Sequence, residues 1–142
     1  MRRTIEVVAA VIVDRGRVLL ASRPADKPPA GLEFPGGKVE PGESANRALR
    51  RELAEELNLD VVPFDELYRV ETGDAERRIV LRFIRTRTAD GAEPVPMEHQ
   101  SFGWYPLSEE RPPELLAPDG PVWDFLRKIH EHQTIFHESG TL

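Results

Sequence analysis

"GGKVEPGESANRALRRELAEELNL", residues 36–59, carries the clearest local signal of the fold, because it joins glycine turns to a helix with clear ends. Ser44 is a good N-cap, and Asn58 can end the helix because asparagine tolerates the left-handed conformation at that position. We therefore expect a helix over about 45–57. Like charges are concentrated on this helix within little more than one turn, at Glu52, Glu55 and Glu56.

The helical positions of these three glutamates show which of them meets the core. With about 100° per residue, the leucines of the helix define a core-facing arc; Glu56 lies near this arc, Glu52 on its border and Glu55 beyond it. A carboxylate at the margin of a core costs desolvation and repulsion unless a cation compensates. Ligands with oxygen alone favour a hard ion such as Mg²⁺ or Mn²⁺. The alternative is a solvated acidic face helped by the Arg51–Glu55 spacing, which explains Glu55 but not Glu56.

Length and composition limit the class of protein. The 142 residues suit one compact domain, expected over residues 1–131 and followed by a loosely ordered tail at 132–142. No apolar run is long enough to span a bilayer, so we expect no membrane partner. The net charge of −6 disfavours binding to nucleic acid, and the absence of cysteine fits a reducing cytoplasm.

Strand patterns fill most of the remaining sequence. The β-branched run 5–13 and the segment 17–23 flank a short turn and predict a hairpin or two neighbouring strands. Pro121 suits the first position of a final helix with one apolar stripe. Three further segments have the composition or the alternation of strands: 64–72, 77–88 and 101–107.

The residues around the three glutamates resemble the signature of the Nudix hydrolase family, G-x5-E-x7-R-E-U-x-E-E-x-G-U, where U is aliphatic. Asn58 stands where the family usually has glycine. The segments "GLEFPGGKVEPGES", "EHQSFGWYPL" and "LAPDGPVWDFL" resemble most the MutT and NudG branch, which hydrolyses nucleoside triphosphates. The matching positions are Gly37, Glu43, Arg51, Glu52, Leu53, Glu55, Glu56 and Leu59.

This resemblance implies both a fold and a reaction. The fold is α/β, also classed as α+β: an α/β/α sandwich with a mixed β-sheet between helices. The reaction is Mg²⁺-dependent hydrolysis of a nucleoside triphosphate, including oxidised or modified forms such as 8-oxo-dGTP or a cytidine-type triphosphate. Water attacks the β-phosphorus, and nucleoside monophosphate and pyrophosphate are released. Mn²⁺ is the expected substitute for Mg²⁺.

The resemblance also implies roles for individual residues. Glu52, Glu55, Glu56 and Glu98 are the expected catalytic carboxylates, and the same four are expected metal ligands together with the carbonyl of Gly36. The general base stays open between Glu98, Glu52 and Glu55. Glu43 and Arg51 are expected to be structural, with Arg51 fixing the geometry of a carboxylate.

Substrate recognition is expected from residues spread along the chain. Arg23 is a candidate for the nucleotide phosphate. Asp119, an acceptor when ionised, is a candidate reader of donors on the base, and it could equally be the N-cap of the final helix. Phe83 and Trp104 could stack on the base or belong to the core. The backbone that borders the base is expected at Glu33, Phe34, Pro35 and Gly36.

Three alternatives remain open at the level of sequence. The substrate could be another nucleoside diphosphate derivative, such as ADP-ribose, a nucleotide sugar or a dinucleoside polyphosphate. The protein could be a catalytically silent binding module, although its acids are intact. It could also be an interaction protein whose acidic helix is only a solvated surface. The preferred base and sugar, the number of metal ions and the choice between monomer and homodimer are left open.

Overall fold

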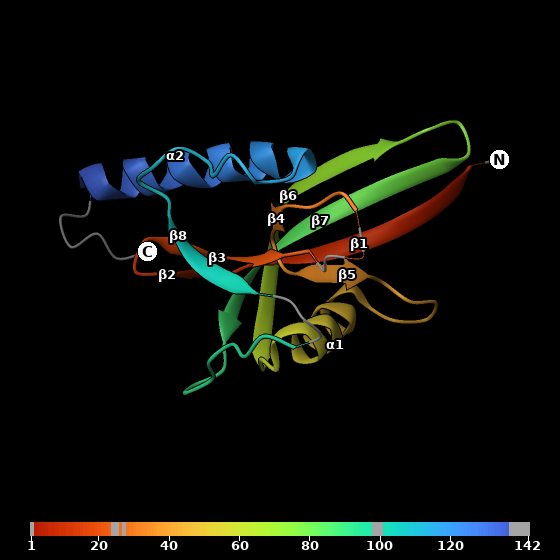
Figure 1. Ribbon diagram of the computed structural model, residues 1–142, viewed down its shortest axis with the longest axis horizontal. Coiled ribbons are helices and arrows are strands. Elements are labelled where there is room, and N and C mark those ends of the chain that lie inside the picture. The colour runs from red at the N-terminus through yellow and green to blue at the C-terminus, as the bar shows by residue number, and fades with distance from the viewer. Residues whose placement is uncertain (1, 24–25, 27, 98–100, 137–142) are drawn as a thin grey trace.

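The computed structural model describes residues 2–23, 26, 28–97 and 101–136, and its strands are divided between two sheets (Figure 1). A mixed sheet has the order β5 (Gly36–Lys38), β1 (Arg3–Val11), β7 (Arg77–Thr88) and β6 (Val61–Gly73). An antiparallel sheet is built on β3 (Arg17–Ser22), which pairs with β2 (Val13–Asp14), β4 (Leu32–Glu33) and β8 (Phe102–Pro106).

The β-branched run at the start of the chain is divided between these sheets. It is interrupted at Ile12, so β1 joins the mixed sheet and β2 joins the antiparallel sheet. The predicted hairpin is therefore confirmed only for β2 and β3, which are connected by Arg15 and Gly16 with φ angles of 54° and 74°. β1 pairs instead with β5 and, in parallel, with β7. These partners lie far away in sequence, which a local pattern does not reveal.

Helix α1 (Ala45–Leu57) has the predicted bounds and caps. The Ser44 side chain accepts a hydrogen bond from the Arg47 N–H at 3.1 Å. Asn58 has the left-handed φ of 48°, and its N–H returns to the carbonyls of Ala54 and Leu53. The two ends of the helix are thus fixed by the residues that the sequence indicated.

Helix α2 (Gly120–Phe136) differs from its prediction at both ends. It begins one residue before Pro121, directly after a 3₁₀ turn at Ala117–Asp119. It continues through residues 132–136, the first part of the segment expected to be a loosely ordered tail, since no glycine or proline follows before position 140. Residues 137–142 of the expected tail lie outside the described residues. In the part of the chain that the structure describes, neither helix is long and apolar enough to cross a membrane.

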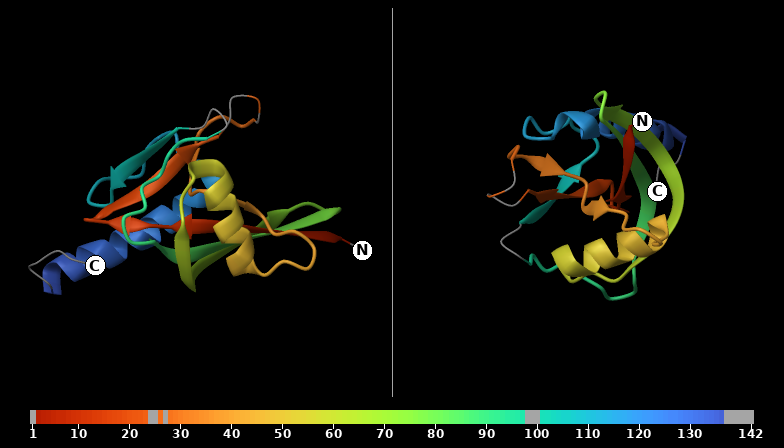
Figure 2. Two further views of the ribbon diagram at one scale, coloured as in Figure 1. Left: turned by 90° about the horizontal axis from the view of Figure 1, so that it is seen from below. Right: turned by 90° about the vertical axis from the view of Figure 1, so that its right-hand side faces the viewer.

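The mixed sheet lies between the two helices, with α2 on one side and α1 on the other (Figures 1 and 2). Alternate residues of β1 face opposite sides: Val8 and Ala10 belong to the core cluster of α1, and Ala9 and Val11 to that of α2. The predicted fold class is confirmed, with the strands arranged in two sheets rather than one. Some side chains on the α2 face of the mixed sheet, such as those of Ala9 and Phe83, also line a cleft.

Candidate active site

A cleft of about 830 Å³ opens beside β1, β7 and α1. Its walls come from segments as far apart in sequence as Val7 and Asp119, so the fold and not the local pattern creates it. Most of the predicted site residues line it: Arg23, Glu33, Phe34, Gly36, Glu52, Glu55, Glu56, Phe83 and Asp119.

Three other candidates have different outcomes. Pro35 does not line the cleft; it is buried, and its carbonyl accepts a hydrogen bond from the Ala10 N–H at 2.8 Å, which anchors this segment to β1. Trp104 lies in another cleft of the molecule, because β8 belongs to the antiparallel sheet. Glu98 lies outside the described residues.

Two glycines allow β5 to approach its neighbours closely. A Cβ atom at Gly36 would overlap the carbonyl oxygen of Val8 in the adjacent strand. A Cβ atom at Gly37 would overlap the carboxyl group of Glu52, so this glycine provides the space that the carboxylate occupies. The Gly36 N–H donates a hydrogen bond to the Glu56 carboxylate. These contacts bring the strand and the acidic face of α1 together.

Arg51 connects a carboxylate of the loop before α1, that of Glu43, with carboxylates of the helix itself. Its guanidinium makes two hydrogen bonds to Glu43, of 2.8 and 2.9 Å, and one to Glu52 of 2.9 Å. It also donates to the carbonyl of Lys38 at 3.0 Å. The hydrogen bonds from Arg51 lower the pKa of Glu43 to about 2, and those to Glu43 raise the pKa of Arg51. Arg51 therefore fixes the orientation of Glu52, as expected for a structural residue.

The three glutamates of α1 have distinct environments. Burial raises the pKa of Glu56 to about 8, and the neighbouring charges of Glu52 and Glu33 act in the same direction. Burial also raises the pKa of Glu52, against the opposing effect of Arg51. Glu55 is the exposed member, with 55% of its side chain accessible and its carboxylate 3.5 Å from Arg51. The helical geometry predicted this order of burial.

The donor set fits a hard divalent cation. Glu52 and Glu56 carry charges of the same sign and are partly removed from water, so a bound cation would stabilise their ionised forms. The acidic groups that line the cleft are carboxylates, whose oxygens are the ligands that such a cation prefers. Among the described residues, no three His, Asp or Glu side chains converge closely enough to form a complete metal site. The α1 carboxylates thus offer a partial site that other oxygen ligands would have to complete.

The other end of the cleft combines aromatic rings with polar groups. Arg23 forms an ion pair with Glu33, with a nitrogen–oxygen distance of 3.2 Å. Phe34 and Phe83 are in edge-to-face contact, with ring centroids 5.7 Å apart, and both are almost fully buried. Their rings therefore belong to the core as well as to the wall of the cleft.

Asp119 is buried at this end, with 5% of its surface exposed. Its Oδ2 accepts a hydrogen bond from the Phe34 N–H at 2.8 Å, and burial raises its pKa to about 7. The alternative role as a helix N-cap is not favoured, because Asp119 belongs to a 3₁₀ turn that continues into α2, whereas an N-cap residue has extended backbone angles. Asp119 instead ties the start of α2 to the segment before β5.

Sequence reasoning missed several apolar residues of the cleft, among them two on β7 and two before α2. Ile79 and Leu81 line it from β7 because the parallel pairing with β1 places them beside Ile5 and Val7. The alternation within 77–88 predicted that Ile79 and Leu81 share one face of the strand, but it did not predict that this face borders the cleft. The other two residues come from the segment before α2: Leu116 and Pro118.

Comparisons with known proteins agree with this geometry. Residues 2–126 match the NUDIX domain. Over 59 residues, or 41% of the chain, the sequence is 59% identical to a CTP pyrophosphohydrolase of Escherichia coli K12, and the match spans 44% of that protein. It is 31% identical over 130 residues to an 8-oxo-dGTP diphosphatase of the same strain, which covers 91% of this chain and all of that protein.

The solved structures give the same result. The solution structure of the E. coli ORF135 protein superposes with a TM-score of 0.76 and 32% identity, covering 93% of this chain and 94% of that one. The two-sheet fold with two helices is thus that of a known class of hydrolases. The chain belongs to the NUDIX family. The sequence-based prediction of a Nudix pyrophosphohydrolase is confirmed at the level of the enzyme class.

Proposed function

We propose that this protein hydrolyses a nucleoside triphosphate to nucleoside monophosphate and pyrophosphate in a Mg²⁺-dependent reaction. The observation that carries the proposal is that one cleft joins the acidic face of α1 to a buried polar and aromatic end. The acids suit the cation and the phosphates, and the other end suits a base. The similarity to a CTP pyrophosphohydrolase and to an 8-oxo-dGTP diphosphatase supports this class of substrate.

Glu52 and Glu56 would hold the cation, with Glu55 and Glu98 as further candidates. When bound, Mg²⁺ would neutralise phosphate charge and favour ionisation of the attacking water. Glu55 has the most exposed side chain of the three α1 glutamates, so it is a candidate to accept the proton of a water that attacks the β-phosphorus. The role of the Gly36 carbonyl as a ligand stays part of this proposal.

The predicted role of Glu98 has indirect support from its neighbours. The N–H groups of Val95 and Met97 donate to the carbonyls of Leu57 and Glu56, at 2.7 and 2.9 Å. The chain immediately before Glu98 is therefore attached to the end of α1 that carries Glu56. We retain Glu98 as a candidate ligand or general base on this ground.

Arg23 and Asp119 would bind the two ends of the nucleotide. The guanidinium of Arg23, paired with Glu33 in the structure, would contact a phosphate. Phe34 and Phe83 would border the base, along with the backbone at Glu33 and Gly36. Asp119 would accept from a base donor, such as the amino group of cytosine or the N7–H of 8-oxoguanine, with acceptor capacity beyond its bond to Phe34.

A substrate panel with Mg²⁺ tests the proposal. The panel contains CTP, dCTP, 5-methyl-dCTP, dGTP, 8-oxo-dGTP, ADP-ribose, a nucleotide sugar and a dinucleoside polyphosphate, with pyrophosphate and phosphate measured separately. We expect pyrophosphate and nucleoside monophosphate from one or a few triphosphates, and a change in preference among bases for Asp119→Ala. Activity on ADP-ribose alone would overturn the substrate class. Unchanged relative rates for Asp119→Ala would remove Asp119 as a base reader.

The setting of the activity follows from the same proposal. The protein would hydrolyse modified triphosphates of the free nucleotide pool in a reducing cytoplasm. It would need no nucleic acid and no membrane as a partner. We keep the two candidate oligomeric states expected from the sequence, a monomer and a homodimer. Light scattering on the purified protein would distinguish the two states.

A further inference from the structure

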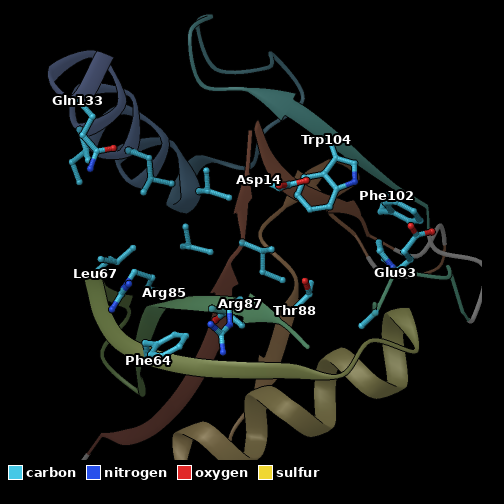
Figure 3. Close-up of a pocket in the computed structure, with 18 residues that line it drawn as sticks. Asp14, Phe64, Leu67, Arg85, Arg87, Thr88, Glu93, Phe102, Trp104 and Gln133 are labelled. Atoms are coloured by element: carbon cyan, nitrogen blue, oxygen red, sulfur yellow. The ribbon is translucent and has the colours of Figure 1, made fainter. Parts of the chain in front are cut away.

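A second cleft, of about 780 Å³, opens at the other end of the parallel pair β1–β7 (Figure 3). The catalytic cleft is lined by Val7 and Ala9 of β1 and by residues up to Phe83 of β7. The second cleft begins further along the same strands, at Val11 and Arg85. Its volume is within the range of small-molecule sites in proteins. The reaction proposed above uses none of its polar groups.

One end of this second cleft is basic and aromatic. Phe64 is 42% exposed, and the guanidinium groups of Arg85 and Arg87 lie 4.9 and 5.5 Å from the centre of its ring. Arg85 is neutralised by an ion pair with Asp65 at 2.6 Å. Arg87 makes no ion pair with any carboxylate in the described part of the chain. One guanidinium is therefore available to an anion.

The opposite end of the second cleft is acidic and aromatic. Figure 3 shows Trp104, Phe102, Asp14 and Glu93 across the cleft from the arginines. Trp104 and Phe102 are alternate residues of β8 and are only half-buried. Both rings also pack against the core cluster of α1, and the guanidinium of Arg17, which does not line the cleft, lies 6.0 Å from the centre of the Trp104 ring. A planar group could stack there, with carboxylates to accept its donors.

We propose that this second cleft binds a nucleoside monophosphate whose base carries an amino group. The base would stack at Trp104 and Phe102, its amino group would donate to Asp14 or Glu93, and its phosphate would bind Arg87. A single available guanidinium, opposed by two acids, suits one phosphate group better than a triphosphate chain. The site is separate from the catalytic cleft, and the proposal does not depend on the reaction proposed above.

The two tryptophans of the chain make a direct test possible. Trp104 lines the second cleft, whereas Trp123 is buried and its Nε1–H donates to the Glu109 carbonyl. In ¹⁵N-labelled protein with EDTA, the two indole N–H signals can be followed during titration with CMP, UMP or inorganic phosphate. We expect CMP to move the Trp104 signal to saturation and to leave the Trp123 signal in place. UMP, which lacks the amino group, and phosphate, which lacks the base, should bind more weakly.

Three variants show whether the shift of the Trp104 signal arises from binding in the second cleft. Arg87→Gln should weaken CMP binding about tenfold or more, as expected for loss of a charged hydrogen bond, without changing turnover. Arg77→Gln, the same change at the exposed start of the same strand, should have no effect on binding. Arg23→Gln, in the catalytic cleft, should leave the shift of the Trp104 signal intact. An unchanged Trp123 signal would show that each variant is folded.

Four results would overturn the proposal. The first is a Trp104 signal that does not move at millimolar CMP, and the second is equal affinity of the parent for CMP and for inorganic phosphate. The third is equal affinity of Arg87→Gln and Arg77→Gln for CMP. The fourth is loss of the shift of the Trp104 signal in Arg23→Gln. The last result would mean that the Trp104 signal reports binding in the catalytic cleft.

Discussion

At the scale of single residues, the site is characterised by carboxyl groups held in unfavourable surroundings. Glu56 and Asp119 line the same cleft, and burial raises the pKa of both, to about 8 and about 7. Each group disfavours the folded state when it is ionised without a partner of opposite charge. Such strain is common where a ligand supplies the missing interaction.

The pH dependence of stability tests this view at Asp119. Because its pKa is raised from 3.8 to about 7, the unfolded chain releases the proton first as pH rises. The ionised group should therefore cost stability progressively between about pH 4 and 7, by at most about 4 kcal/mol, with the full cost above that range. Asp119→Asn keeps an acceptor for the Phe34 N–H and removes the charge. We expect it to be more stable than the parent at pH 8 and not at pH 4.

Urea unfolding at both pH values, without metal, measures this difference. The exposed Asp90→Asn is the matched control and should follow the parent at each pH. Parallel stability curves for Asp119→Asn and the parent between pH 5 and 8 would contradict the burial assigned to this carboxyl group.

Gly37 allows a second test at the residue scale. A methyl group there would overlap the Glu52 carboxyl group, which Arg51 holds in place. Gly37→Ala should therefore lower Mg²⁺-dependent turnover by about tenfold or more, as expected for a displaced site carboxylate, with little change in folding. Steady-state kinetics and circular dichroism measure the two effects.

The control for Gly37→Ala is Gly42→Ala. Gly42 has a φ of 78° and no neighbour within 4 Å of an added Cβ, so alanine there should cost stability through backbone strain and leave turnover unchanged. If both variants lost turnover equally, the contact between Gly37 and Glu52 would not be the cause.

At the scale of elements, the sequence predicted local structure better than pairing. The bounds of α1 follow from Ser44 and Asn58, and those of β7 from its alternation, since each signal is contained within the element. The break at Ile12 could not be predicted, because it depends on which sheet each half of the run joins. The same applies to the cleft: the burial order of the α1 glutamates was predicted, but the placement of Trp104 was not.

The cap of α1 provides a test at this scale. Asn58 has a left-handed backbone, so Asn58→Gly should leave stability unchanged or slightly raise it, whereas Asn58→Ala should lower it by about 1 kcal/mol. Urea unfolding of both variants gives the free energies. Equal losses for glycine and alanine would show that the side chain of Asn58, and not its backbone conformation, stabilises the helix end.

At the scale of the whole molecule, the parallel pair β1–β7 positions both clefts. The register places Val7 beside Leu81 and Ala9 beside Phe83, on the face that lines the candidate active-site cleft. Further along the same pair, Val11 lies beside Arg85 in the second cleft. Residues from 7 to 119 meet in the cleft beside α1 because this central pair joins the two halves of the chain.

Metal-dependent release of pyrophosphate is proposed to depend on the buried end of the α1 acidic face, where Glu56 lies. The decisive measurement is the rate of pyrophosphate release from the best triphosphate of the panel, at saturating Mg²⁺, for the parent, Glu56→Gln and the exposed control Glu110→Gln. We expect a loss of at least about a hundredfold for Glu56→Gln, with the fold retained and the control at the parent rate. Turnover by Glu56→Gln at the parent rate would contradict the proposed role of this carboxylate.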